Sequence, residues 1–451
     1  MKKMKHDVPT RLVKVLILIL MMVAFGFVWY GYYAARAQVH YYRRGDWVVI
    51  LLFGILYYGF CRSYDAFHIS ISPISEIIYS QTLALIISDF IMYVVIWLLS
   101  LYMPNAVPLL ITFGVQFLIS VLWTFLAHQW YFHNFRPGRT AVIYDLREGM
   151  ESLVGEYGME KKFHIEKVLG VEECLAKLSV LDEMDTVFLS GIHSHERNII
   201  LKYCMYQDIQ VYVIPRIGDV IMGGAKKVHM FHLPMLRIDR YRPIPEYTIA
   251  KRAFDILFSG IAIVIASPFM LVTAIAIKSD GGPALYKQKR LTKDGKEFNV
   301  LKFRSMRVDA EKDGVARLST GDKDDRITPV GKIIRKIRFD ELPQLFNILR
   351  GDMSIVGPRP ERPEIARQYE EEMPEFRLRL QAKAGLTGYA QVYGKYNTTP
   401  YDKLLMDLTY IGTPSLWEDF KICLATVKIL FMPESTEGVA EGATTAMNGK
   451  K

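Results

Sequence analysis

Cysteine is scarce in this 451-residue sequence, and the four that occur are far apart. They stand at positions 61, 174, 204 and 423, without a CxxC pair. Disulfide frameworks and zinc sites need numerous or closely spaced cysteines. The number and spacing of the cysteines therefore argue against a disulfide framework and against a zinc site, and they indicate a reducing compartment.

Glycine-rich phosphate loops are also missing. The sequence contains no GxxxxGK[ST] motif, which argues against a P-loop kinase or nucleotide hydrolase. Residues 140–144, 186–190 and 211–214 have the apolar pattern of buried parallel strands separated by helices. A ligand binds such a sheet at the first strand–helix turn, but here that turn, 144–149, lacks GxGxxG and carries two acidic side chains. We therefore expect a structural or regulatory domain that binds no dinucleotide.

Long apolar runs, by contrast, are plentiful, and 51% of the residues are hydrophobic. Four runs, each near the roughly 20 residues that cross a bilayer, cover 12–33, 47–61, 77–102 and 107–128. Basic residues precede the first run and no small-residue cleavage site follows it, so we expect an uncleaved anchor that starts in the cytoplasm. Four spans then return the chain to the cytoplasm.

A fifth apolar run, 254–277, is also long enough to span the membrane. Basic residues flank it on both sides, and the positive-inside rule cannot place both flanks in the cytoplasm if the run crosses. Pro268, near its middle, removes a backbone donor, and Ser267 can satisfy the carbonyl that this frees. We expect a helix broken at these two residues that enters one leaflet and returns. A spanning helix is the alternative that length alone favours.

Positive charge is concentrated after this run. The formal net charge is +9, and residues 278–350 hold a surplus of Lys and Arg, which suits nucleic acid, anionic lipid or phosphorylated substrates. Residues 286–288 and 298–303 are expected to be strands of a hairpin. Lys302 and Arg304 alternate with a phenylalanine there, so the pattern predicts that the two cations share one face.

Two adjacent carboxylates, Asp340 and Glu341, follow a basic stretch and precede a short apolar helical pattern. By themselves they are typical of a helix N-terminal cap, with Pro343 tolerated in the first turn. Further on, the stiff segment Gly357-Pro358-Arg359-Pro360 places a cation between two prolines. Because acidic, basic and membrane-embedded features converge on this region, we interpret it as a functional site.

Seven motifs between about 250 and 430 resemble the bacterial sugar transferases, which are polyprenyl-phosphate hexose-1-phosphate transferases also called monotopic phosphoglycosyl transferases. The motifs are Lys251-Arg252, Ser267-Pro268, Gly281-Gly282-Pro283, Lys302-Phe303-Arg304-Ser305-Met306, Asp340-Glu341-Leu342-Pro343-Gln344, Gly357-Pro358-Arg359-Pro360 and Gly385-Leu386-Thr387-Gly388. Each is weak alone, but their order and spacing are specific. The sequence departs from the family pattern at Thr292, Arg338 and Lys395.

The resemblance implies a membrane protein of α plus α/β class, in the large form of the family. We expect four transmembrane helices in 1–135, a Rossmann-like α/β domain in 136–240, and a membrane-associated catalytic domain in 241–432 with a re-entrant helix at 254–277. Residues 433–451 lack aromatics and predict a disordered tail. The implied location is the bacterial inner (plasma) membrane, with the active site on the cytoplasmic face.

The resemblance also implies transfer of a sugar-1-phosphate from a UDP-sugar to polyprenyl (undecaprenyl) phosphate, with release of UMP, for polysaccharide assembly. It implies no nucleic-acid partner, and it leaves a homo-oligomer open. The resemblance implies that Asp340 is the covalent nucleophile and that Glu341 binds Mg²⁺. It implies that Arg335 and Arg359 bind the diphosphate, with Lys302 and Arg304 as further candidates. It also implies that Lys251 and Arg252 bind the lipid phosphate. A non-catalytic membrane scaffold is the alternative, but it does not account for the Asp-Glu pair.

Overall fold

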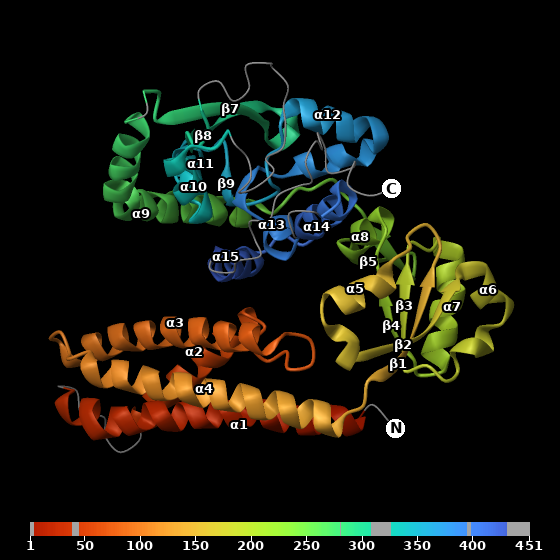
Figure 1. Ribbon diagram of the computed structural model, residues 1–451, viewed down its shortest axis with the longest axis horizontal. Coiled ribbons are helices and arrows are strands. Elements are labelled where there is room, and N and C mark those ends of the chain that lie inside the picture. Colours follow the sequence, from red (N-terminus) through yellow and green to blue (C-terminus); the bar gives the residue numbers. More distant parts are fainter. Residues whose placement is uncertain (1–3, 38–44, 280, 308–325, 395–397, 431–451) are drawn as a thin grey trace. The chain divides into compact units, whose positions relative to one another are not determined.

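The computed structural model describes residues 4–37, 45–279, 281–307, 326–394 and 398–430 (Figure 1). Contacts divide the chain into two compact units, Met1–Ile214 and Pro215–Lys451, which are described separately. The expected tail at 433–451 lies outside the described residues.

The first unit begins with four long apolar helices. They are α1 (Met4–Val28), continued by η1 (Trp29–Tyr33) and η2 (Ala34–Arg36), then α2 (Gly45–Ser63), α3 (Ile74–Ser100) and α4 (Val107–Asn134). Each is long and apolar enough to cross a membrane, yet only 28–33% of its most apolar window is buried in the protein. Exposed apolar surface on that scale needs lipid or another protein to cover it. The four expected runs are therefore helices, and their membrane crossing stays a prediction from length and composition.

A four-stranded parallel sheet completes this unit. Its strands are β1 (Gly138–Tyr144), β2 (Phe163–Gly170), β3 (Thr186–Ser190) and β4 (Gln210–Val213), in the order β2-β1-β3-β4. The three strands expected from the sequence are confirmed. Strand β2 was not predicted, because exposed and partly buried residues alternate along it instead of forming an apolar run.

Helices cover both faces of this sheet. Ala141 and Ile143 of β1 pack on the side of α6 (Val171–Ala176) and α7 (Ser194–Tyr206), with η4 (Leu178–Leu181) beside them. Val142 packs on the opposite side, with α5 (Met150–Glu156) and η3 (Met159–Lys161). This alternation explains why residues 141–143 of β1 are apolar on both faces of the sheet.

The turn after β1 lies where the strand order reverses, which is the usual ligand position in such sheets. Gly191 has a φ of +69°, and a Cβ there would come within 2.8 Å of the backbone nitrogen of Arg147. The loop after β1 thus lies directly against the loop after β3. That the domain binds no dinucleotide stays a prediction.

The second unit starts earlier than expected. It contains α8 (Ile217–Gly223) and the antiparallel hairpin of β5 (Lys226–Met230) and β6 (Leu233–Arg237), which the sequence analysis had placed in the α/β domain up to residue 240. The physical reason is that α8 packs on α14 (Pro400–Gly412). A Cβ on Gly224 would come within 2.8 Å of the Cα of Gly412, so the backbones touch there.

The fifth apolar run forms one helix, α9 (Pro245–Lys278), whose ribbon turns through a sharp bend (Figure 1). The prediction that Ser267-Pro268 breaks the helix is therefore wrong in its detail, since helical backbone continues through both residues. Ser267 Oγ donates to the carbonyl oxygen of Val264 at 2.8 Å. That carbonyl is the one that the N–H of a non-proline residue at 268 would bind. The serine thus replaces the missing donor and lets the helix continue through the proline.

Both ends of α9 contact the same folded domain. Near its N-terminus, Arg252 donates twice, at 2.6 Å each, to the last carbonyls of α11 (Gln344–Arg350), and Asp255 accepts from the backbone N–H of Ile355 at 2.9 Å. At its C-terminus, the carbonyl of Ile277 accepts from Arg304 at 3.0 Å. A straight helix of 34 residues would separate its ends by about 50 Å. The bend is what returns the second end to the domain.

The remaining elements form a compact α+β domain. They are β7 (Leu285–Leu291), η5 (Lys293–Gly295), β8 (Glu297–Phe303), α10 (Pro329–Lys336), η7 (Phe339–Glu341), β9 (Ser354–Val356), α12 (Pro363–Glu372), η8 (Pro374–Gln381), β10 (Gly385–Thr387), α13 (Tyr389–Tyr393) and α15 (Leu416–Leu430). β7 and β8 form the expected antiparallel hairpin, and β9 pairs with β10 in parallel. Buried Asn347 of α11 bonds to the backbone of β8 at Leu301 and Asn299, 2.9 Å each, and so fixes the segment after Glu341 against the hairpin.

Candidate active site

The two adjacent carboxylates lie in one short turn between α10 and α11. Arg338 takes a left-handed conformation with a φ of +55°, which ends the α10 segment and opens the 3-10 turn η7. Asp340 and Glu341 lie in η7, and α11 begins only at Gln344, after Pro343 as its N-cap residue. The interpretation of Asp340 as a helix cap is therefore wrong. This turn leaves both carboxylates available for chemistry.

Glu341 is held by two cations from different segments. Its Oε1 lies 2.7 Å from Lys302 Nζ of β8 and 3.4 Å from an Nη of Arg359, and its side chain is 15% exposed. Burial by itself would raise the pKa of Glu341, but the charges of Lys302 and Arg359 outweigh it and hold the pKa well below its usual range. Glu341 is therefore an ionised carboxylate at neutral pH.

The neighbouring carboxylate is shifted in the opposite direction. Burial raises the pKa of Asp340, and the negative charge of Glu341 raises it further, while Lys302, Arg335 and Arg338 act against both effects. Two adjacent carboxylates with opposed shifts can take different roles, one as a fixed negative charge and one as the more basic group. The site thus distinguishes its two acids by environment.

Arg335 stands at the last turn of α10 and faces this pair. Its Nη1 is buried and has no hydrogen-bond partner among the described residues. A buried guanidinium nitrogen without a partner is costly, and phosphate oxygens would satisfy it. This arrangement is consistent with Arg335 as a binding residue for an anionic ligand.

Arg359 reaches the site from a turn of close-packed backbone. The N–H of Gly357 donates to the carbonyl of Thr387, and the N–H of Gly385 donates to that of Pro358, both at 2.9 Å. A Cβ on Gly357 would lie 2.3 Å from the carbonyl oxygen of Lys383, which no side chain allows. One close approach between this turn and β10 thus explains the motifs that contain Gly357 and Gly385.

Three other predicted site residues have partners elsewhere in the protein. Lys251 Nζ lies 2.9 Å from Asp419 and donates to Tyr410 Oη at 3.0 Å, while Arg252 caps α11. Arg304 donates to the end of α9 and is 7% exposed, whereas Lys302 contacts Glu341. Arg304 lies one residue beyond the end of β8, and that the two cations share one face stays a prediction. The proposed lipid-phosphate role of Lys251 and Arg252 stays a prediction.

The residues of the site fit a magnesium ion held in part by the substrate. Among the described residues no group of three His, Cys, Asp or Glu side chains could enclose a metal. Mg²⁺ usually binds through one or two carboxylates together with substrate phosphates and water. Ionised Glu341 beside Asp340 supplies that donor set, and Lys302 would have to share the Glu341 carboxylate with the ion.

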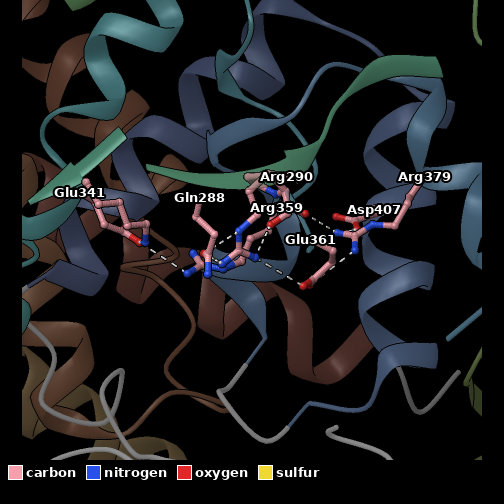
Figure 2. A network of polar contacts seen from close by, with 9 residues as sticks. Gln288, Arg290, Glu341, Arg359, Glu361, Arg379 and Asp407 are labelled. Carbon is pink, nitrogen blue, oxygen red and sulfur yellow. Dashed lines mark hydrogen bonds and ion pairs between the residues drawn. The ribbon is translucent and has the colours of Figure 1, made fainter. Parts of the chain in front are cut away.

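A largely buried polar network, not predicted from the sequence, lies on the side of Arg359 away from Glu341 (Figure 2). It joins Gln288 and Arg290 of β7, Glu361, Arg379 of η8 and Asp407 of α14 (Figure 2). Asp407 is 1% exposed, and burial raises its pKa to about 6. One signal was present: Asp407 is the lone carboxylate in an otherwise apolar helical stretch, which predicts a buried partner.

Comparison with known proteins gives consistent matches over this unit. Residues 246–433 match the sequence model of the family described as bacterial sugar transferase. A UDP-N-acetylgalactosamine-undecaprenyl-phosphate N-acetylgalactosaminephosphotransferase of Aeromonas hydrophila is 39% identical over 234 residues, which are 51% of this chain and 54% of the relative. A UDP-glucose:undecaprenyl-phosphate glucose-1-phosphate transferase of Escherichia coli is 38% identical over 212 residues, 46% of this chain and 44% of the relative.

The chain thus spans about half the length of these two relatives, and more of a shorter one. A UDP-glucose:undecaprenyl-phosphate glucose-1-phosphate transferase of Caulobacter vibrioides is 41% identical over 201 residues, 43% of this chain and 74% of the relative. The matched region contains α9, the two carboxylates, the Arg359 turn and the network behind it. On this evidence the chain belongs to the bacterial sugar transferase family.

Proposed function

We propose that this protein transfers a sugar-1-phosphate from a UDP-sugar to undecaprenyl phosphate, as the names of its relatives describe for those proteins. The observation that carries the proposal is geometric: Asp340 and Glu341 share one turn, Lys302 and Arg359 lie 2.7 Å and 3.4 Å from Glu341, and Nη1 of Arg335 is buried without a hydrogen-bond partner among the described residues. Transfer of a phosphoryl group depends mainly on positioning and on neutralising charge, and this arrangement supplies both.

In the first step, an oxygen of Asp340 attacks the phosphorus that bears the sugar. The bond from that phosphorus to the bridging oxygen breaks, and UMP leaves with the electron pair. The product is an aspartyl phosphosugar. The raised pKa supports Asp340 in this role, since a more basic carboxylate is the better nucleophile once ionised.

In the second step, a phosphate oxygen of the polyprenyl phosphate attacks the same phosphorus. The bond to Asp340 breaks, the carboxylate is restored, and the lipid-linked diphosphate sugar is released. Two displacements at one carboxylate let two anionic substrates react in turn, which avoids bringing both anions together at once.

The cations hold the diphosphate during these steps. Arg335 and Arg359 are suited to this because a guanidinium matches phosphate with two parallel donors. Mg²⁺, when bound at Glu341, would neutralise charge on the diphosphate oxygens. Lys302 keeps Glu341 ionised and in place for that purpose.

The bend of α9 supports a re-entrant helix, with the active site on the cytoplasmic face of the inner membrane. Both ends of the helix contact the domain that holds Asp340, and only 11% of its most apolar window is buried. A helix that crossed the bilayer would have to separate those ends. A re-entrant helix leaves nucleotide sugar and lipid phosphate access to one site.

The direct test is an assay of purified protein with ³²P-labelled UDP-sugars and undecaprenyl phosphate in detergent. Magnesium-dependent release of UMP together with label in the lipid phase is the expected result. The relatives are named for N-acetylgalactosamine, glucose and galactose transfer, so these three donors come first. UMP release without labelled lipid would indicate a hydrolase, and neither product with any donor would favour the scaffold alternative.

A further inference from the structure

Two arginines, one buried and one partly buried, hold the backbone next to the Arg359 side chain. Arg379 Nη2 donates to the carbonyl oxygen of Arg359 at 2.9 Å, and Arg290 Nη1 donates to that of Pro360 at 3.0 Å (Figure 2). The Arg379 side chain is 4% exposed and that of Arg290 is 18% exposed. They come from η8 and β7, so the turn is fixed from two separate elements.

Two carboxylates neutralise these arginines. Glu361 lies 3.9 Å from Arg290 Nη1 and 3.6 Å from Arg379 Nη1, and Asp407 lies 2.7 Å from Arg379 Nη2. Buried ion pairs gain little stability over apolar side chains of similar size, because desolvation of the charges offsets their attraction. A gain in stability is thus a weak explanation for this network. Its contacts with the Arg359 turn indicate that its role is to hold that turn in place.

Arg379 cannot itself reach the reacting groups. Its guanidinium contacts the Arg359 carbonyl, Asp407 and Glu361, and it lies over the ring of Phe376 with its central carbon 4.8 Å from the ring centroid. The Arg359 side chain, by contrast, is 45% exposed and extends from the same turn to Glu341. One arginine is therefore anchored inside the domain and the other acts at its surface.

We propose that Arg379, held by Asp407 and Glu361, is a positioning residue for Arg359: it fixes the backbone from which the Arg359 guanidinium reaches Glu341 and the substrate diphosphate. This inference rests on the proposed function, because it assumes that Arg359 binds that diphosphate. A displacement of about 1 Å at a substrate-binding group can cost on the order of 100-fold in rate. Loosening the turn should therefore be visible in catalysis.

The test is a double-mutant cycle on kcat/KM with the full-length protein. Arg379→Gln should lower kcat/KM by about 10- to 100-fold in the wild-type background. In an Arg359→Gln background, the same change should cost less than about threefold, because there is no guanidinium left to position. Equal losses in both backgrounds would overturn the proposal, since Arg379 would then act independently of Arg359.

Lys302 supplies the matched control, because it contacts the same Glu341 oxygen from β8 and not from the turn. Arg379→Gln should cost as much in a Lys302→Met background as in the wild type. If Arg379→Gln lowers the yield of folded protein, the same cycle is run with the near-isosteric Asp407→Asn, which loosens Arg379 without removing it. Arg379→Lys should recover only part of the rate, since an ammonium cannot serve three partners in a plane.

The failure of this inference can be told from failure of the proposed function. If the wild-type protein labels no lipid with any donor, the transferase assignment fails. If the wild type is active and the losses multiply independently, only the positioning role of Arg379 fails.

Discussion

Lys302 Nζ lies 2.7 Å from Glu341 Oε1 and connects the end of strand β8 to the turn that holds both site carboxylates. The pair is mostly shielded from solvent, with the lysine 21% and the glutamate 15% exposed. The positive charge of Lys302 therefore acts on both carboxylates with little screening by solvent.

The first prediction concerns pH. Lys302 lowers the pKa of both Asp340 and Glu341, because a nearby cation favours the ionised carboxylate. Lys302→Met removes this effect, so both pKa values should rise. Because the reaction needs Asp340 ionised, the acid limb of the pH profile of kcat/KM should move to higher pH by about one unit or more.

The control for this measurement is Lys332→Met. Lys332 is exposed on the same α10 helix that carries Arg335, and the change removes the same charge without touching Glu341. Its acid limb should stay where the wild type has it. A shift of equal size in both variants would mean that overall charge, and not the ion pair with Glu341, sets the profile.

The second prediction concerns the metal. Glu341→Gln should lower kcat/KM severely, and the remaining activity should need about 10- to 100-fold more Mg²⁺. The reason is that an amide oxygen carries no charge and binds a hard cation poorly. Magnesium titration of the rate measures this, with exposed Glu364→Gln of α12 as the matched control. An unchanged requirement in Glu341→Gln would remove this residue as a metal ligand.

The third prediction concerns the Arg359 turn. Gly357→Ala should lower the thermal midpoint in detergent by several degrees, because the new methyl group would lie 2.3 Å from a backbone carbonyl oxygen and must displace β10. Gly218→Ala is the control: no atom lies within 4 Å of its Cβ position in α8, and alanine favours helix by up to about 1 kcal/mol over glycine. A midpoint for Gly357→Ala equal to that of the control would contradict the close approach.

The fourth prediction concerns the topology of α9. With the four native cysteines replaced, Ala250→Cys and Leu285→Cys should both react with an impermeant thiol reagent only from the cytoplasmic side. This labelling is expected because both ends of α9 contact the same domain. Pro268→Leu restores a backbone donor and removes a clash worth about 3 kcal/mol in a straight helix, so it should shift part of the population to a spanning form and lower activity in proportion. Labelling of the two positions from opposite sides in the unmutated protein would refute the re-entrant helix.

The sequence was informative where one local rule decides the structure. The buried strands at 140–144 and 186–190, the hairpin before Phe303 and the apolar helices all follow from residue periodicity and turn residues, and all are present. Asp340, Glu341 and Arg359 were identified from motif order. The structure adds that Lys302 contacts Glu341, which neither residue's neighbours in the sequence could indicate.

The remaining features depend on tertiary contacts between distant segments. Arg304 lies one residue beyond the end of its strand and donates to the end of α9, and Lys251 pairs with Asp419, 168 residues away. The helix expected to break at Pro268 continues through it, since Ser267 supplies the donor that proline lacks. Arg379 of η8 and Asp407 of α14 are brought together only by the fold, so neither segment alone could predict their ion pair.

The proposed mechanism requires that Asp340 forms a covalent bond to the sugar phosphate. The most direct measurement is intact-protein mass spectrometry after rapid acid quench of the enzyme with UDP-sugar and Mg²⁺, without lipid acceptor, followed by peptide mapping. The expected result is a mass increase of one sugar-phosphate on the peptide that contains Asp340. The increase should be lost on adding undecaprenyl phosphate, and Asp340→Asn should show neither the adduct nor transfer activity. Full turnover by a folded Asp340→Asn protein, or an adduct on any other residue, would contradict it.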